Sequence, residues 1–294
     1  MSVRPVGASG GRRGSPPATG SRFRGPATGA FGLTRGIPIA QLNTADGWRV
    51  NYNAMATGND TTVSAASASL TATRFQQSAD IGAPTVTIAS AAATVAPFIG
   101  FSATTYNVVG AATGRQMNDV PTNNRGFGVI AATANQAIEW FWYMGVGFGT
   151  GFVANGSAFF GLGSSGSNVL TAAGALATVS HAGFHIANVT GAVNCTQGNV
   201  TTRRTAATTT GVSAVVDLNY YKLGMRGQFK TNVANAMTDG FTEFYIDDIL
   251  VQKFTPNGTM QAPTGVGPAF SVVSIGANAL IQTVGYSFGY RVVS

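Results

Sequence analysis

Only one place in this chain of 294 residues has two adjacent acids. In "FYIDDILVQKF" (244–254), Asp247 and Asp248 stand between two apolar runs, and Glu243 precedes them. Glycoside hydrolysis needs two carboxyl groups about 5 to 9.5 Å apart. In an extended strand Glu243 and Asp247 would be roughly 13 Å apart, and the adjacent aspartates would point to opposite faces. We therefore interpret the two aspartates as hairpin-turn residues, since Asp tolerates the positive φ that a two-residue turn requires.

Other residues with catalytic or ligand chemistry are sparse. His181 and His185 in "SHAGFH" have a helical spacing, but their neighbours indicate a strand and no Cys or carboxylate lies nearby to complete a metal site. We expect both to be hydrogen-bonded, in the core or at an interface. The stretch "GVGFGTGF" (145–152) lacks the lysine of a phosphate-binding loop, and its pattern does not indicate a strand–loop–helix setting. The single Cys195 is interpreted as a small core or surface residue, so the sequence predicts no enzyme, metal or cofactor.

Three aromatic residues gather in "AIEWFWYMGVGF" (137–148), where Trp140, Trp142 and Tyr143 share one expected strand. Trp140 and Trp142 fall on the same face of that strand. Such a pair is either part of the core of a sandwich or a platform on which sugar rings stack. We favour the core, and keep all three as candidates for a glycan or interface contact.

Positive charge is concentrated at the N-terminus. The chain has 17 Lys and Arg against 10 Asp and Glu, a formal net charge of +7. No acid precedes residue 37, whereas six arginines do: Arg4, Arg12, Arg13, Arg22, Arg24 and Arg35. Residues 1–36 are otherwise rich in Gly, Pro and Ser, which predicts an extended arm. The remaining body is nearly neutral, so only the arm is a candidate for contact with nucleic acid.

Two partners suit such an arm. Arginines could neutralise phosphates, but widely spaced guanidinium groups are better placed to form bidentate contacts with the carboxylates of an acidic protein surface. We favour docking onto protein, with Arg12, Arg13, Arg22 and Arg24 as the anchoring residues. Charged residues make up only 9% of the chain, which is typical of a subunit that is buried among its neighbours.

From residue 37 onward the pattern is that of β-strands. Short runs of Val, Ile, Phe, Tyr and Thr alternate with Gly, Asn and Ser, and no amphipathic stretch is long enough for a substantial helix. The Ala-rich segment 61–75 is also expected to be strand or loop. No apolar run approaches 18 residues and no apolar segment follows the first arginines, so we expect neither a membrane span nor a signal peptide. We therefore predict two units: an arm, 1–36, and one β-sandwich domain, 37–294.

Two C-terminal stretches show the alternation of strands with one face in a core. In "YYKLGMRGQF", Tyr221, Leu223 and Met225 are expected to point inward. In "QTVGYSFGYRVV" the inward residues are expected to be Val284, Tyr286, Phe288, Tyr290 and Val292.

The order "LNYYKLGMRG", "GFTEFYIDDILVQKF", "TPNGTMQAPTGVGPAFSVVSI" and a closing strand resembles the last third of a concanavalin A-like (laminin-G-like) jelly roll. The family's hairpin pattern F-x-I-D-G-x-L-V is matched at Phe244, Ile246, Asp247, Leu250 and Val251. Asp248 stands where the family has Gly, which suggests local hydrogen bonding by its carboxylate. The resemblance covers about residues 135–294 and implies an all-β fold, an antiparallel sandwich of the jelly-roll type.

Domains of this kind recur in the structural proteins of tailed bacteriophages, and the low charge of this chain is similar. The resemblance therefore implies a virion structural protein made in the host cytoplasm, although fold alone does not fix function. We expect a capsid decoration (cement) protein, anchored by its arm to the major capsid protein or another virion protein, forming homo-oligomers such as trimers, with no membrane partner. One alternative is a fibre or tail receptor-binding protein that binds glycans. The other is a shell-forming coat protein whose arm binds nucleic acid.

Overall fold

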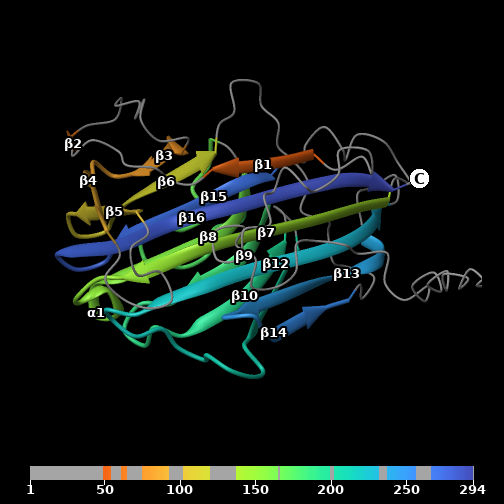
Figure 1. Cartoon of the computed structure of the whole chain (residues 1–294). Coiled ribbons are helices and arrows are strands. Elements are labelled where there is room, and N and C mark those ends of the chain that lie inside the picture. The colour runs from red at the N-terminus through yellow and green to blue at the C-terminus, as the bar shows by residue number, and fades with distance from the viewer. Residues whose placement is uncertain are drawn as a thin grey trace, which may run out of the picture.

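Figure 1 shows the computed structural model of the chain, a sandwich of two antiparallel β-sheets. The arm, 1–36, with all six of its arginines, lies outside the described residues. The prediction of an all-β antiparallel sandwich is confirmed. The structure describes residues 49–53, 61–64, 75–92, 102–119, 137–164, 166–198, 202–231, 237–255 and 266–293.

The larger sheet has nine strands within the described residues. Along it the order is β14-β13-β12-β7-β16-β5-β4-β2, and β1 pairs with β16. Its strands are β1 (Arg49–Asn53), β2 (Thr61–Ser64), β4 (Thr85–Ala92), β5 (Ser102–Val109), β7 (Ala137–Phe148), β12 (Tyr220–Thr231), β13 (Met237–Ile246), β14 (Ile249–Phe254) and β16 (Asn278–Val293).

The smaller sheet has seven strands within the same described residues, in the order β11-β10-β9-β8-β15-β6-β3. Its outer face is partly covered by the connection between β8 and β9, whose Val169 and Leu170 pack against Phe159 and Val273. Its strands are β3 (Phe75–Ile81), β6 (Thr113–Asp119), β8 (Gly156–Ser164), β9 (His181–Ile186), β10 (Val193–Gly198), β11 (Arg203–Ala207) and β15 (Val266–Ser274).

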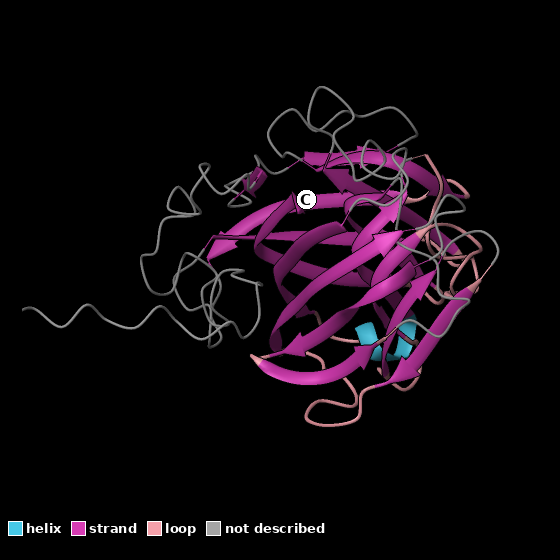
Figure 2. Ribbon diagram, turned by 90° about the vertical axis from the view of Figure 1, so that its right-hand side faces the viewer, coloured by secondary structure: helices cyan, strands magenta, loops and turns pink. Residues whose placement is uncertain are grey.

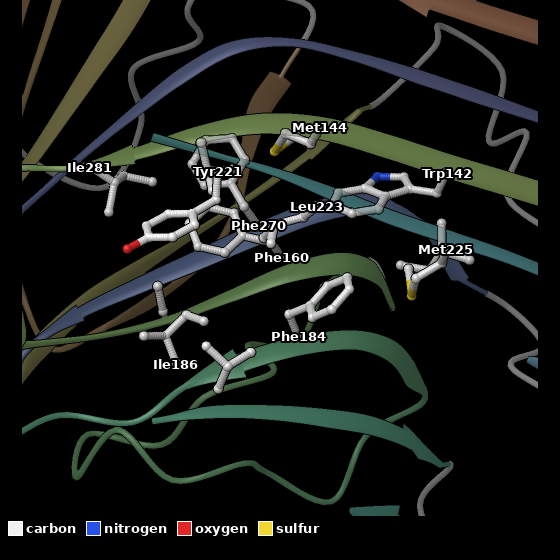
Figure 3. Packing of buried hydrophobic residues seen from close by; sticks show 14 of the residues in the cluster. Trp142, Met144, Phe160, Phe184, Ile186, Tyr221, Leu223, Met225, Phe270 and Ile281 are labelled. Atoms are coloured by element: carbon white, nitrogen blue, oxygen red, sulfur yellow. The ribbon is translucent and has the colours of Figure 1, made fainter. Parts of the chain in front are cut away.

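The core lies between the two sheets and is formed by alternate residues of strands from both, such as Trp140, Trp142 and Met144 of β7 and Ala158, Phe160 and Leu162 of β8. Burying each of its large side chains contributes about 1.5–3 kcal/mol. The predicted inward faces of β12 and β16 are confirmed for Tyr221, Leu223, Met225, Phe288 and Tyr290. In Figure 3, Trp142, Met144, Leu223 and Met225 of the large sheet face Phe160, Phe184 and Phe270 of the small sheet.

Some predictions about strands reach beyond the described part of the chain. The segment 61–75 is strand at both described ends, in β2 and at the first residue of β3, and 65–74 lie outside the described residues. The side chains of Val284, Tyr286 and Val292 are likewise not described.

The two ends of the sandwich differ. Seven alternate connections, β3–β4, β5–β6, β7–β8, β9–β10, β11–β12, β13–β14 and β15–β16, lie at one end, because every pairing between neighbouring strands is antiparallel. The helix α1 (Phe152–Asn155) lies there, and we call this end the α1 end; it is on the left in Figure 1. At the opposite end, toward the viewer in Figure 2, lies the C-terminus, and Arg49 of β1 pairs with Tyr290.

Candidate functional site

The Asp247-Asp248 pair forms the two-residue turn between β13 and β14. Ile246 pairs with Ile249 across it, and the two aspartates have φ of 50° and 68°. Asp247 Oδ1 accepts a hydrogen bond from the amide of Lys222 at 2.8 Å, and Asp248 pairs with Lys222 Nζ. The turn interpretation is therefore confirmed. The suggestion of local hydrogen bonding by Asp248 is wrong, because its carboxylate bonds to Lys222 of β12, 26 residues away in the chain.

Both histidines lie on the outer face of the small sheet, in β9, and form hydrogen bonds. His181 is buried; its Nδ1 donates to the carbonyl of Val179 at 2.7 Å, so its Nε2 is the acceptor for the hydroxyl of Thr196 at 2.9 Å. Burial lowers the pKa of His181 to about 4. The expectation of strand-borne, hydrogen-bonded histidines is confirmed. Within the described residues no group of three or more His, Cys, Asp and Glu is placed to hold a metal ion.

The fold also brings Ser157 and His185 together, a contact that the sequence did not reveal. Ser157 Oγ lies 3.2 Å from His185 Nε2, but the same nitrogen lies 2.8 Å from the carbonyl oxygen of Gly174. Because a carbonyl can only accept, Nε2 carries the proton and cannot take one from the serine. Ser157 Oγ in turn lies 2.8 Å from the carbonyls of Gly174 and Ile186. This pair holds the β8–β9 connection in place and does not form an activated nucleophile.

The local structure of the glycine stretch 145–152 differs from the one predicted from the sequence. It does have a strand–loop–helix setting, because β7 ends at Phe148 and the one-turn helix α1 begins at Phe152. The amides of Gly151 and Val153 both donate to the carboxylate of Asp217, at 2.6 and 2.9 Å. The chain's own aspartate thus occupies the position where such a loop would hold an anion.

The tryptophans of β7 belong to the core. Trp140 and Trp142 are fully buried in the core cluster, so the core interpretation is confirmed and neither indole offers a surface to a sugar. Tyr143 points to the other face of the sheet, where it packs near Phe141, with ring centroids 6.1 Å apart. Burial raises the pKa of Tyr143 to about 12.

The outer face of the large sheet carries a network of charged and aromatic side chains over β12, β13 and β14. Glu243 lies at its centre. It accepts hydrogen bonds from Arg226 Nε at 2.6 Å, from the Tyr245 hydroxyl at 2.7 Å and from Lys253 Nζ at 2.9 Å. Burial disfavours the carboxylate, but the bonds from Lys253, Tyr245 and Arg226 outweigh it and hold the pKa of Glu243 below its usual range.

The two cations of this network lie over aromatic rings and remain accessible. The Arg226 guanidinium is 5.4 Å from the centre of the Tyr245 ring, and Lys253 Nζ is 4.6 Å from the centre of the Phe241 ring. Their side chains are 31% and 46% exposed, whereas Glu243 is nearly buried beneath them. Because Arg226 and Lys253 are already held in place and partly exposed to water, they can donate hydrogen bonds to an oxygen-rich ligand without the entropic cost of being ordered on binding. We call Arg226, Phe241, Glu243, Tyr245 and Lys253 the Glu243 network.

A second acid on this face is bound more deeply. Glu139 of β7 is fully buried and pairs with Arg291 of β16, with Nη2 2.6 Å from Oε2. Its other oxygen, Oε1, has no hydrogen-bond partner among the residues that the structure describes. The strand register puts Glu139 two strands and two residues from Glu243, so their Cα atoms are about 12 Å apart. Glu243 is held ionised, so it is not placed to supply the proton that the leaving group needs in glycosidic cleavage.

The predicted site residues are therefore separated. Trp140 and Trp142 lie in the core, Tyr143 borders the outer face, and the six arginines of the arm lie outside the described residues. The sequence reading weighed Glu243 only as a partner of Asp247 and did not anticipate the Glu243 network. Alternation could have indicated it, since Arg226, Glu243 and Lys253 all fall on outward positions of neighbouring strands.

Fold and site together define an all-β antiparallel sandwich with a charged and aromatic outer face. No family model and no curated protein matches the chain. Among solved structures, it is similar to the carbohydrate esterase of the Shiga toxin-encoding bacteriophage phi24B, with 15% identity over 74% of this chain and 90% of that one, and a TM-score of 0.37.

Two botulinum neurotoxin structures show the same level of similarity. The binding domain of neurotoxin DC has 10% identity over 72% of this chain and a TM-score of 0.36. The binding domain of serotype D has 7% identity over 74% of this chain and a TM-score of 0.35. The chain covers 44% and 49% of their lengths. Identities this low leave the function of this chain to be argued from its own residues. No helix in the described ranges is long and apolar enough to cross a membrane.

Proposed function

We propose that this chain is a receptor-binding protein of a phage particle, and that the outer face of the large sheet binds a glycan of the host surface. The Glu243 network is the observation that supports this proposal most directly. It offers two partly exposed cations, fixed by one carboxylate and two aromatic rings, on an open sheet face. Sugar hydroxyls and sugar carboxylates accept hydrogen bonds from such groups.

A glycan array with the full-length protein identifies the ligand, and titration then gives its dissociation constant. The variants Arg226→Gln and Lys253→Gln each remove one charged donor, and we expect each to weaken binding about tenfold or more. Arg203→Gln is the matched control, because Arg203 is a cation of the small sheet that bonds to the carbonyl of Leu176. Equal affinity for all four proteins, or no glycan bound by the parent, would refute the proposal.

A capsid decoration protein is the second candidate, and the exposed apolar residues of the α1 end favour it. Sugars are bound through aromatic rings and polar groups, whereas exposed Val, Leu and Ile are typical of protein contacts. Salt-dependent binding of the full-length protein to emptied capsids, lost on deletion of residues 2–36, would support this role; binding that survives the deletion would contradict anchoring by the arm. A coat protein whose arm binds nucleic acid stays a prediction, because that arm lies outside the described residues.

A further inference from the structure

Every exposed large apolar residue in the described part of the chain lies at the α1 end. Val189 and Val216 belong to the connections β9–β10 and β11–β12, and so does Leu218; Val109 ends β5, and Ile249 and Leu250 begin β14. Hydrogen bonds join these connections around α1: Val189 N donates to Val153 O at 2.7 Å, and Val215 N donates to Gly191 O at 2.9 Å. Val189, Val216 and Leu218 therefore lie together in one patch. Thr210 of the β11–β12 connection donates to the carbonyl of Leu250, which places Ile249 and Leu250 beside it.

Two residues of the patch are held in an unfavourable backbone conformation. Val189 has φ of 69° and is 71% exposed, and Leu218 has φ of 64° and is 61% exposed. A branched or bulky side chain at positive φ is an outlier in proteins, and such strain concentrates at functional sites. Neither side chain is buried in the core, so intramolecular packing does not explain why these positions are apolar.

The α1 end is also acidic. Its connections contain Asp217, Asp247 and Asp248 and no Lys or Arg. Asp248 pairs with Lys222 of β12. Asp217 and Asp247 accept hydrogen bonds from backbone amides, and among the described residues no cation forms an ion pair with either. A partner for this end should therefore combine positive charge with apolar side chains.

The chain itself contains such a segment. Residues 1–36 carry six arginines and no acid, and apolar residues stand among them, as in Arg22-Phe23-Arg24 and "AFGL" (30–33). We propose that the α1 end binds the N-terminal arm of a second copy of this chain. Phe23, Phe31 and Leu33 would contact the Val189–Val216–Leu218 patch, and the arginines would lie near Asp217 and Asp247.

The position of β1 favours binding between copies. Arg49 pairs with Tyr290, at the end of the sandwich opposite the patch. The 12 residues 37–48 span at most about 40 Å when fully extended. From Tyr290 to the start of β16 the strand is about 40 Å long. Leu33 is 16 residues from Arg49, so it could reach the α1 end of its own chain only with residues 34–48 largely extended, which costs conformational entropy. The arm of a neighbour need not cross the length of the sandwich. The contact is heterologous, so repeated binding leads to rings or to open chains.

The self-association of the full-length protein tests this directly by sedimentation velocity over a concentration series. We expect concentration-dependent association that weakens with salt, and monomers after deletion of residues 2–36. The double variant Val216→Asn/Leu218→Asn should weaken association about tenfold or more. Arg22→Gln/Arg24→Gln should also weaken it, whereas the matched body variant Arg203→Gln/Arg204→Gln, on the small sheet, should not. Thermal unfolding confirms that each variant is folded.

Mixing two defective proteins identifies the partners. The arm-deleted chain has an intact α1 end, and the Val216→Asn/Leu218→Asn chain has an intact arm. Each alone should be monomeric, and the mixture should form one-to-one pairs. A parent protein that stays monomeric at all concentrations, or unchanged association after either alteration, would overturn the proposal. Glycan binding by the Glu243 network should survive both alterations, so failure of one proposal is distinguishable from failure of the other.

Discussion

The backbone at Val189 leads to a sharp prediction: the substitution Val189→Asn should stabilise the isolated protein. An L-residue in the left-handed region costs about 1–2 kcal/mol, and Asn adopts that region more readily than a β-branched residue. The side chain of Val189 is 71% exposed, so little packing is lost on substitution. The amide of Val189 still donates to the carbonyl of Val153 in the variant.

We therefore expect a net gain of about 1 kcal/mol in the free energy of unfolding. For a domain of this size such a gain raises the melting temperature by about 2–4 °C. Val216→Asn is the matched control, because Val216 is also exposed but is not among the residues with positive φ. That change from Val to Asn should alter stability by less than about 0.5 kcal/mol.

Differential scanning calorimetry of the parent and the two variants decides the matter. If Val189→Asn lowers the melting temperature, or shifts it no more than Val216→Asn does, the left-handed valine is not strained and this reasoning fails. If the variant is more stable but self-associates less, the strain is maintained for binding, as expected of a functional surface.

Three further perturbations test the interior and the hairpin. Replacing Arg291 by Met should cost about 3–5 kcal/mol, measured by denaturant unfolding, because it leaves the carboxylate of Glu139 buried without a cation; Glu139→Gln in the same chain should recover part of the loss, and no recovery would contradict the ion-pair account. Stability should be nearly constant between about pH 7 and 8 and fall by about 3 kcal/mol between pH 6.5 and 4, because the unfolded chain takes up a proton there that buried His181 does not. His181→Gln should reduce that slope, and an unchanged slope would assign it to other groups. Asp248→Gly should raise the melting temperature slightly, since Gly favours positive φ and the lost ion pair with Lys222 lies at the surface; a clear decrease would show that the ion pair matters more than the turn.

Features that depend on neighbouring residues were predictable from the sequence. The hairpin at Asp247 and Asp248 follows from turn chemistry between two apolar runs, and the inward face of β12 follows from strict alternation at Tyr221, Leu223 and Met225. Both properties are decided within about ten residues of chain. The buried state of Trp140 follows in the same way from its place in a strand that, apart from Glu139, is apolar on both faces.

Features that depend on pairing between strands distant in the sequence could not be predicted from local sequence patterns. Glu139 and Arg291 are 152 residues apart, and only the pairing of β7 with β16 brings them together. One signal was present, since an acid within the apolar run of β7 requires a cationic partner. The patch at the α1 end is even harder to predict from the sequence. It can be recognised only when the fold shows that the connections of both sheets meet at one end.

The distribution of negative charge links the two proposed surfaces. Four described carboxylates, Asp80, Glu139, Glu243 and Asp248, form ion pairs with Arg or Lys. Asp217, Asp239 and Asp247 accept only backbone amides among the described residues. Two of these three lie at the α1 end, far from Arg49, where the N-terminal segment enters the fold. These two acids therefore lie at the end of the sandwich opposite Arg49, and in the proposed assembly the arm of a neighbouring copy supplies their positive charge. The Glu243 network keeps its cations beside its own carboxylate and remains available to a different ligand.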